Sequence, residues 1–523
     1  MSSVLTREPD ALPRWSVGRL ARLVRPDTAA VIAIVLVAST VFFTNLTGPA
    51  FQDDEGTYTA QALSLDDGDL APYTYWYDHP PVGWIQLAML IWIPRLFGLG
   101  DGIDIAAMRY VIALYFVANA VLIYLIARRI TVTMTFALLG VAAFVFSPLS
   151  LSLGRQIFLD TIALPWLLLA FYLVLSPRMA LWSHAAAGAS FAIAVLSKLT
   201  AAVMGPALLV ALIDRRAWQG RMFSVMGFLT VGALVLAFYP LMALLRGELV
   251  SGDGHVSLQD GLLYQFTARE GSGYVWEAGS ARSELLLSWA VGDGFLVVGG
   301  AIAAALCLVS RRTRWVTVAV GSFFMPVMVG EGYLPSMYIV AGIPFLCIAL
   351  AAASDLIRRA VLRLGRDRLP NQALATPIVL VGVTLLMLVQ TPVLGWVARD
   401  RELLSSDQNS DFRDTLEWMR ANVPRDDVVL TPYSMWHDLD SRGWDDSWTM
   451  IALEKADLDP AYKVQHPTGW EGIEWIIEGP TVRSNLEVLG LTTASTALQN
   501  SEIVRTFGAW NIRRVQTDAS VGP

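Results

Sequence analysis

The feature that most constrains this chain is a series of long stretches without a charged side chain, which recur through roughly its first 400 residues. A helix needs about 20 apolar residues to cross a bilayer. Seven charge-free stretches approach or exceed that length: 28–52, 110–127, 130–154, 161–177, 222–245, 332–354 and 370–398. Four more are shorter or interrupted: 179–197, 199–213, 315–330 and 285–310, which Asp293 breaks. We therefore expect an α-helical polytopic membrane protein with about eleven spans.

Composition excludes several other classes of protein. Of the 523 residues, 55% are apolar and only 16% are charged, whereas an average soluble domain has about 25% charged residues. The net charge of -7 argues against a nucleic-acid-binding protein, and two cysteines cannot form a disulfide scaffold. We expect a lipid bilayer and no nucleic acid among the partners.

The distribution of basic residues predicts the orientation, because Lys and Arg collect in cytoplasmic loops. With the N-terminus inside, the inner segments hold nineteen basic and six acidic residues, whereas the outer loops and span ends hold seven and eighteen. This predicts a cytoplasmic segment 1–27 and a transmembrane domain 28–398 with outer loops 51–109 and 246–286. An odd number of spans then places the tail, 399–523, outside the cytoplasm.

The tail has the pattern of a small extracytoplasmic α/β domain. Helical spacing of apolar residues predicts a helix over 411–423, and short apolar runs predict strands at 428–430 and 473–477. Further expected elements are helices at 485–489 and 496–507 and a closing strand at 510–515. The apolar run 82–94 is too short to span and predicts an interfacial helix.

The candidate chemistry lies in the first outer loop. Asp53, Asp54 and Glu55 directly follow the first span, where three adjacent carboxylates either serve a function or form an acidic helix start. Asp78 and His79 precede two prolines, which fix a rigid turn. On the residues alone, His79 is equally consistent with a structural role.

These motifs resemble the GT-C membrane glycosyltransferases that use polyprenyl-phosphate sugars. The closest resemblance is to protein O-mannosyltransferases and their bacterial relatives, the aminoarabinose transferases. It covers about residues 28–220 and rests on Asp54-Glu55, on Asp78-His79-Pro80-Pro81-Val82-Gly83, and on the stretches 154–160 and 196–200. The aminoarabinose enzymes have a lysine where this chain has His79. The resemblance implies a polyprenyl-phosphate-linked sugar donor, and the mannosyltransferases imply no metal.

Chemical roles follow from this reading. A lipid phosphate leaves as a stable anion, so the enzyme needs a base for the acceptor and cations for the phosphate. Asp54 is the candidate base of an inverting transfer, and Glu55 orients it or the acceptor. The candidate substrate-binding residues are Asp78, His79, Arg109, Arg155, Asp160, Lys198, Arg269 and Arg282. Lys198 is the only lysine before the tail, and an ammonium between apolar runs needs an anion unless it snorkels. Arg109 and Arg155 bind phosphate or instead pair with acids to fix helix ends.

Several alternatives stay open at this point. A divalent cation held by the loop's carboxylates is possible but not favoured, and we expect no cofactor. The same cationic groove would suit a transporter or binding protein for an anionic polyprenyl lipid. Within the enzyme class, en bloc oligosaccharide transfer competes with transfer of one sugar. The acceptor hydroxyl could belong to a protein, a cell-wall glycan or a glycolipid in the envelope. Thirty-five of the 38 basic residues are arginine, which suggests a bacterium and hence its cytoplasmic membrane.

Overall fold

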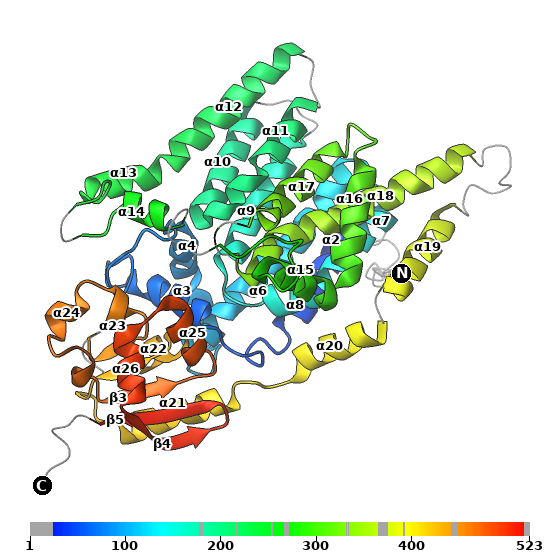
Figure 1. Ribbon diagram of the computed structural model, residues 1–523. Coiled ribbons are helices and arrows are strands. Elements are labelled where there is room, and N and C mark those ends of the chain that lie inside the picture. The colour runs from blue at the N-terminus through cyan, green and yellow to red at the C-terminus, as the bar shows by residue number, and fades with distance from the viewer. Residues whose placement is uncertain are drawn as a thin grey trace, which may run out of the picture.

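The computed structural model describes residues 25–176, 181–214, 218–252, 255–265, 271–330, 332, 334–364, 375–390, 393–440 and 448–516. Most of the predicted N-terminal segment and Arg269 lie outside these ranges. A bundle of apolar helices forms the larger part of the molecule, and a sheet with short helices packs against one end of it (Figure 1).

The bundle packs around a continuous apolar core. Its helices are α2 (Pro26–Phe43), α6 (Asp104–Arg129), α7 (Met134–Val145), α8 (Pro148–Leu153), α9 (Leu159–Val174), α10 (Leu181–Ser197), α11 (Gly205–Asp214), α12 (Trp218–Leu236), α13 (Phe238–Leu245), α15 (Ala281–Gly292), α16 (Gly300–Cys307), α17 (Arg314–Met328), α18 (Ile339–Leu364) and α19 (Ala375–Gln390). Within the described ranges, four helical segments are long and apolar enough to span a membrane, or five with one bent pair. The remaining apolar helices are shorter, so the count of eleven spans stays a prediction.

Two predicted spans are interrupted, and the carboxylate of Asp293 links the two interruptions. The stretch 130–154 divides into α7 and α8, and the stretch 285–310 bends by 103° between α15 and the segment that continues into α16. Asp293 lies at this bend, where its carboxylate accepts hydrogen bonds from Ser147 Oγ at 2.5 Å and from the Leu296 N–H at 2.9 Å. Asp293 therefore satisfies a backbone N–H after the bend and ties the bend to the residue that precedes α8.

The first loop folds into helices on the end of the bundle. Helix α3 (Asp53–Ser64) begins with a capping box, in which the Glu55 carboxylate accepts from the Gln52 N–H at 3.1 Å. The predicted helix over 82–94 is broken at Ile91 into α4 (Val82–Leu90) and α5 (Trp92–Leu96). Trp84 and Leu87 of α4 are fully buried, so this helix packs into protein on one side.

The C-terminal segment forms a five-stranded sheet in the order β2-β1-β3-β5-β4. Helices α20 (Val393–Ser405) and α21 (Ser410–Asn422) lead into it. The strands are β1 (Val429–Thr431), β2 (Met450–Ala452), β3 (Trp475–Glu478), β4 (Ser501–Phe507) and β5 (Trp510–Val515). β1 is parallel to β2 and β3, whereas β5 is antiparallel to β3 and β4. The connecting helices are α22 (Tyr433–Asp440), α23 (Lys455–Leu458), α24 (Tyr462–Gln465), α25 (Val482–Leu489) and α26 (Thr492–Gln499).

The helix predicted over 496–507 is wrong beyond residue 499. Helix α26 ends at Gln499, and Ser501–Phe507 is strand β4, which pairs with β5 through a two-residue turn at Gly508 and Ala509. β-Branched Ile503, Val504 and Thr506 suit a strand, and pairing along β5 overrides the weak helical pattern.

The sheet end of the molecule contacts the first loop directly. Helix α22 packs on α3, and a Cβ at Gly56 would lie 2.1 Å from the Tyr433 carbonyl oxygen. Only glycine permits this approach. Tyr73 of the loop donates to the Met450 carbonyl at 2.7 Å and accepts from the Ala452 N–H at 3.1 Å. The loop therefore lies between the bundle and the sheet.

Candidate active site

The three consecutive carboxylates at the start of α3 lie in three different environments. Asp53 points to the C-terminal segment, where it accepts hydrogen bonds from Ser434 Oγ at 2.8 Å, Thr481 Oγ1 at 2.7 Å and Asn485 Nδ2 at 3.3 Å. With three donors on one carboxylate, Asp53 joins α3 to α22 and α25.

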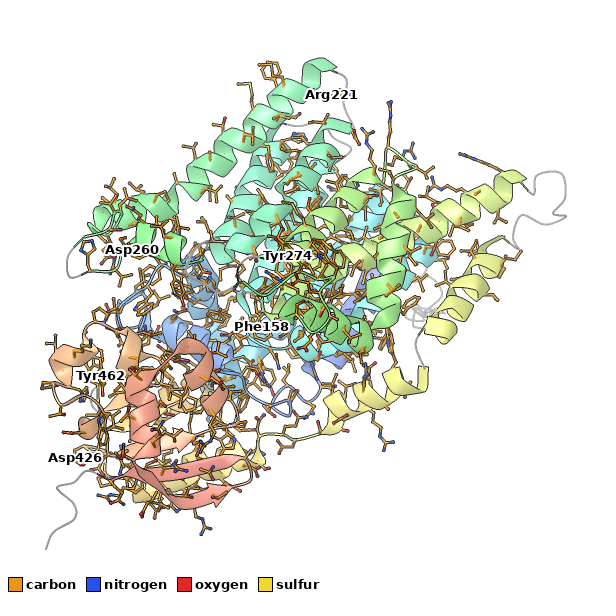
Figure 2. All side chains as sticks on the ribbon, viewed as in Figure 1. Phe158, Arg221, Asp260, Tyr274, Asp426 and Tyr462 are labelled. Atoms are coloured by element: carbon orange, nitrogen blue, oxygen red, sulfur yellow. The ribbon has the colours of Figure 1, made fainter. Side chains whose placement is uncertain are left out.

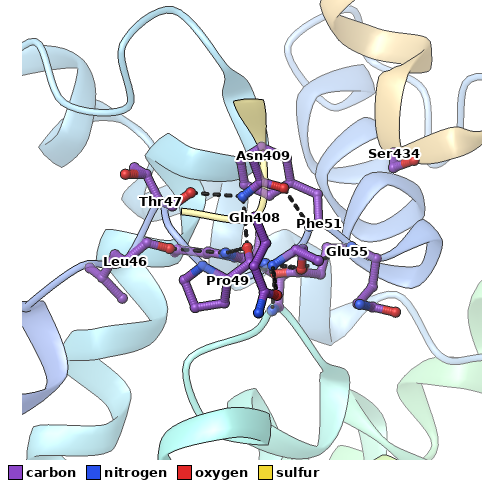
Figure 3. Close-up of polar contacts among 12 residues, drawn as sticks. Leu46, Thr47, Pro49, Phe51, Glu55, Gln408, Asn409 and Ser434 are labelled. Carbon is purple, nitrogen blue, oxygen red and sulfur yellow. Dashed lines mark hydrogen bonds and ion pairs between the residues drawn. The ribbon is translucent and has the colours of Figure 1, made fainter. Parts of the chain in front are cut away.

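Glu55 is fully buried and also occupied. Arg109 donates to its two oxygens at 2.8 and 2.5 Å, and the Ile157 N–H donates at 2.9 Å. The remaining N–H groups of Arg109 donate to the carbonyl oxygens of residues 46, 49 and 50. Asn409 holds the same segment through the carbonyls of Thr47, Gly48 and Pro49 and the Phe51 N–H (Figure 3). All five donors of Arg109 are therefore in use.

Asp54 differs from both neighbours. Within the parts of the chain that the structure describes, no hydrogen bond holds its carboxylate, which is partly buried. Burial raises the pKa of Asp54 to about 6; the Lys198 charge opposes this shift, and Asp53, Asp160 and Glu55 add to it. Asp54 is thus a free carboxylate whose pKa lies near neutrality.

Lys198 brings together three of the predicted residues. Its Nζ lies 3.2 Å from His79 Nε2 and 3.9 Å from Asp160 Oδ2. Lys198 follows the last residue of α10, and Asp160 lies in the first turn of α9, so two helix ends meet here. The structure therefore joins His79, Asp160 and Lys198 in one cluster, and the charges of Lys198 and Asp160 act on Asp54, although the four residues are far apart in the sequence.

The Pro80-Pro81-Val82-Gly83 sequence explains how His79 reaches this cluster. A Cβ at Gly83 would lie 2.6 Å from the Leu159 side chain and 3.1 Å from the Ser197 carbonyl oxygen, so glycine lets α4 pack on the ends of α9 and α10. Gln86, one turn later, donates to Ser197 Oγ at 2.8 Å. Tyr75 Oη donates to the His79 carbonyl at 2.6 Å, which fixes the backbone from the other side.

Two predicted phosphate ligands have other partners. Arg109 has no donor left, as described above. Each nitrogen of Arg155 donates to a backbone carbonyl, namely Leu151 at 2.8 Å, Thr44 at 2.6 Å and Leu403 at 2.9 Å. The geometry thus favours a structural role for both: Arg109 pairs with an acid, Glu55, whereas Arg155 binds backbone carbonyls. Arg282 is buried and donates to the Gly332 carbonyl at 2.9 Å, and its charge, like that of Asp160, acts on Tyr338.

Asp78 faces a different space from His79. It lines a cavity of about 520 Å³ between the first loop, α14 (Leu258–Leu263) and the C-terminal segment. Asp260 of α14 marks one side of this region in Figure 2. Glu454 and Lys455 line the cavity from the far side, and sequence reasoning missed both. The available signal was that Lys455 is one of only three lysines in the chain.

Carboxylates are numerous here, but they do not converge as metal ligands do. Within the described ranges, no three or more His, Cys, Asp or Glu side chains form a group that could hold a metal ion. Asp53 and Glu55 bind protein donors instead, as their hydrogen bonds show.

Comparison with known proteins places this site in context. Residues 78–243, which include His79, Asp160 and Lys198, match the family described as dolichyl-phosphate-mannose-protein mannosyltransferase. A comparison with curated protein sequences found no match.

Solved structures with the same fold cover almost the whole chain. ArnT from Cupriavidus metallidurans, bound to undecaprenyl phosphate, is 14% identical with a TM-score of 0.57, covering 97% of this chain and 100% of that one. The oligosaccharyltransferase AglB from Archaeoglobus fulgidus, with an inhibitory peptide and a dolichol-phosphate, is 11% identical with a TM-score of 0.53, covering 95% and 75%. The arabinofuranosyltransferase AftD from Mycobacteria is 15% identical with a TM-score of 0.51, covering 94% and 40%. The resemblance predicted from the motifs is therefore confirmed: the chain has the fold of the GT-C glycosyltransferases, and the segment carrying His79, Asp160 and Lys198 matches the mannosyltransferase family.

Proposed function

We propose that this protein is an inverting glycosyltransferase that moves a single sugar from a polyprenyl-phosphate donor to a hydroxyl acceptor. The reaction takes place at the outer face of a bacterial cytoplasmic membrane, in the first outer loop 51–109. The C-terminal domain 399–523 lies on the same side. The acceptor belongs to the cell envelope.

The proposal rests on the environment of Asp54. Of the three adjacent carboxylates, Asp54 alone has no hydrogen bond within the described ranges, and the charge of Lys198 lowers its pKa. Lys198 in turn lies within 3.2 Å of His79. A free base therefore lies within the field of an ammonium group that donates to an imidazole, and a hydroxyl acceptor and a phosphate leaving group require a base and a cation of this kind.

The chemistry follows from these positions. The acceptor oxygen attacks the anomeric carbon from the face opposite the phosphate, and its proton passes to a carboxylate oxygen of Asp54. The bond between the anomeric carbon and the phosphate oxygen breaks, and its electron pair remains on the lipid phosphate. The Lys198 ammonium and the His79 imidazole bind that phosphate. A base with a pKa near 6 is ionised at neutral pH and remains basic enough to accept the proton.

The remaining candidates hold these groups in place. Asp160 is buried with its Oδ2 3.9 Å from Lys198 Nζ, and this ion pair holds the lysine side chain in position. Glu55, through Arg109, fixes the first turn of α3 and so orients Asp54. Arg155 ties the ends of two helices through carbonyl groups. Arg269 and Arg282 remain candidates for binding the donor, through its sugar or its lipid phosphate. Asp78 remains a candidate for binding the acceptor.

The fold comparisons support the donor class. ArnT with this fold was solved with undecaprenyl phosphate, and AglB with a dolichol-phosphate. Both ligands are polyprenyl phosphates, and one of them is the product that our reaction would release.

The proposal is tested with the purified protein in lipid vesicles. We expect release of undecaprenyl phosphate from undecaprenyl-phosphate sugars, with one sugar gained by an envelope acceptor fraction and an inverted anomeric linkage by NMR. Movement of the intact donor between leaflets without cleavage would instead identify a transporter. Transfer of a preassembled oligosaccharide from a diphosphate carrier would identify an en bloc enzyme.

A further inference from the structure

The cavity of about 520 Å³ next to Asp78 is built from parts of the chain that are distant in sequence. Its walls come from α3, from the loop 71–78, from α14 and from the C-terminal segment. The volume lies within the range of about 300–1,000 Å³ that is typical of small-molecule sites. The cavity is therefore large enough for a ligand.

The cavity lies on the same helix face as the proposed base. Asp54, Thr57 and Gln61 are spaced three and four residues apart on α3, so their side chains share one face, and the last two line the cavity. Glu454 lies on the opposite wall, and the charges of Asp53 and Asp54 both raise its pKa. A ligand in the cavity would therefore lie next to the helix face of α3 that also carries Asp54, one turn before Thr57.

Three residues that line the cavity carry polar atoms without a hydrogen-bond partner in the described ranges. These buried atoms are Gln61 Oε1, Trp76 Nε1 and Glu454 Oε2. Buried polar groups are almost always paired in native proteins, and leaving one unpaired is destabilising. The set comprises two acceptors and one donor. A ligand with several hydroxyl groups suits such a mixed set of donors and acceptors, because each hydroxyl both donates and accepts.

Aromatic rings supply the other half of the lining. Tyr73, Trp76, Tyr264 and Tyr433 all border the cavity. Lys455 Nζ lies 4.6 Å from the centre of the Trp76 ring and 3.8 Å from Asp459 Oδ2, so its charge is already compensated. Aromatic faces next to polar hydrogen-bonding groups match a sugar ring, which presents an apolar C–H face and a hydroxyl edge.

We propose that this cavity is the acceptor subsite, that it holds a sugar ring of a glycan, and that Glu454 and Lys455 of the C-terminal segment bind it. The inference rests on the proposed function, because the hydroxyl of the bound sugar is the one that Asp54 deprotonates. Burial, together with the charges of Asp53 and Asp54, raises the pKa of Glu454 to about 7, so this carboxyl group can donate as well as accept.

The test uses the full-length protein in nanodiscs and an array of oligosaccharides of mannose, glucose, galactose and arabinose, with Ser- and Thr-containing peptides beside them. We expect at least one oligosaccharide to bind, and Glu454→Gln and Trp76→Phe each to weaken that binding by about tenfold, the loss of one or two hydrogen bonds. Trp76→Phe keeps an aromatic ring, although a smaller one, and removes the N–H group. The matched control is Glu502→Gln, which changes an exposed carboxylate on β4.

The outcomes separate the two proposals. Peptide binding without oligosaccharide binding would overturn the glycan subsite, as would oligosaccharide binding that neither Glu454→Gln nor Trp76→Phe weakens, provided that thermal unfolding shows both variants folded. Sugar transfer to a peptide hydroxyl in the same preparations would then leave the proposed function intact. Oligosaccharide binding that depends on Glu454, in a protein that transfers no sugar from any donor, would instead overturn the proposed function alone.

Discussion

Three neighbouring acids show how far apart the roles of adjacent residues can be. Asp53 is bound by the C-terminal segment and Glu55 by Arg109, whereas Asp54 has no hydrogen bond to the residues that the structure describes. Helix geometry causes this division, because successive residues on a helix point about 100° apart. Substituting each acid should therefore give a different phenotype.

The pKa of Asp54 determines the pH dependence that we expect for the transfer rate. The base must be ionised, so kcat/KM should rise with pH and level off above about 6, the pKa of Asp54. A pH–rate profile between 4.5 and 8 measures this midpoint. A flat profile over that range, with the protein still folded, would contradict the role of Asp54.

The free energy of unfolding should also depend on the ionisation of Asp54, but it should fall as the pH rises. The folded pKa of Asp54 lies above the unfolded value of 3.8, so its contribution to stability is highest below 3.8 and declines as pH rises through about 6. Asp54→Asn removes the free-energy cost of keeping this buried carboxylate ionised. The variant should unfold at a higher temperature than the wild type at pH 7.5, but not at pH 4. Equal effects at both pH values would show that ionisation is not the cause.

Lys198 tests the phosphate end of the site. Charged hydrogen bonds are worth about 1.5–3 kcal/mol, so Lys198→Met should weaken binding of undecaprenyl phosphate by about 10- to 100-fold. Lys463→Met changes an exposed lysine on α24 and should leave binding unchanged. Native mass spectrometry of the lipid complex measures both. Wild-type affinity in Lys198→Met would place the phosphate elsewhere.

At the scale of elements, the packing of α3 on α22 determines where Asp54 lies. Gly56→Ala would put a methyl group 2.1 Å from the Tyr433 carbonyl oxygen and push the helices apart. We expect lower thermal stability and a lower transfer rate, although Gly56 is not placed against substrate. Gly321→Ala is the matched control, because a Cβ there meets nothing within 4 Å and alanine favours a helix. A fully active Gly56→Ala would show that this contact is unimportant.

Sequence patterns predicted local elements better than their partners. The strand at 510–515 and the helix near 411–423 are present, because their apolar spacing is strong. The helix over 496–507 was wrong beyond residue 499, because pairing with β5 determines the strand. Arg109 and Arg155 looked like phosphate ligands from charge alone. Their carbonyl partners at residues 46 and 403 come together only in the fold.

At the scale of the molecule, Asp53 connects the loop to the C-terminal segment through three hydrogen bonds. Asp53→Ala should loosen this contact and increase hydrogen exchange in α22 and α25. Asp66→Ala is the control, because its ion pair with Arg95 is more than half exposed on both sides and contributes little. Unchanged exchange in Asp53→Ala would show that other contacts suffice to hold the C-terminal segment.

In the proposed reaction, Asp54 removes the proton from the acceptor while Lys198 and His79 hold the lipid phosphate. The most direct measurement is single-turnover sugar transfer by Asp54→Asn, with donor binding measured on the same preparation. We predict a loss of about 10²- to 10⁴-fold in rate with donor affinity equal to or tighter than that of the wild type. Transfer at the wild-type rate would contradict the account, and so would a loss of donor binding that accounts for the whole effect.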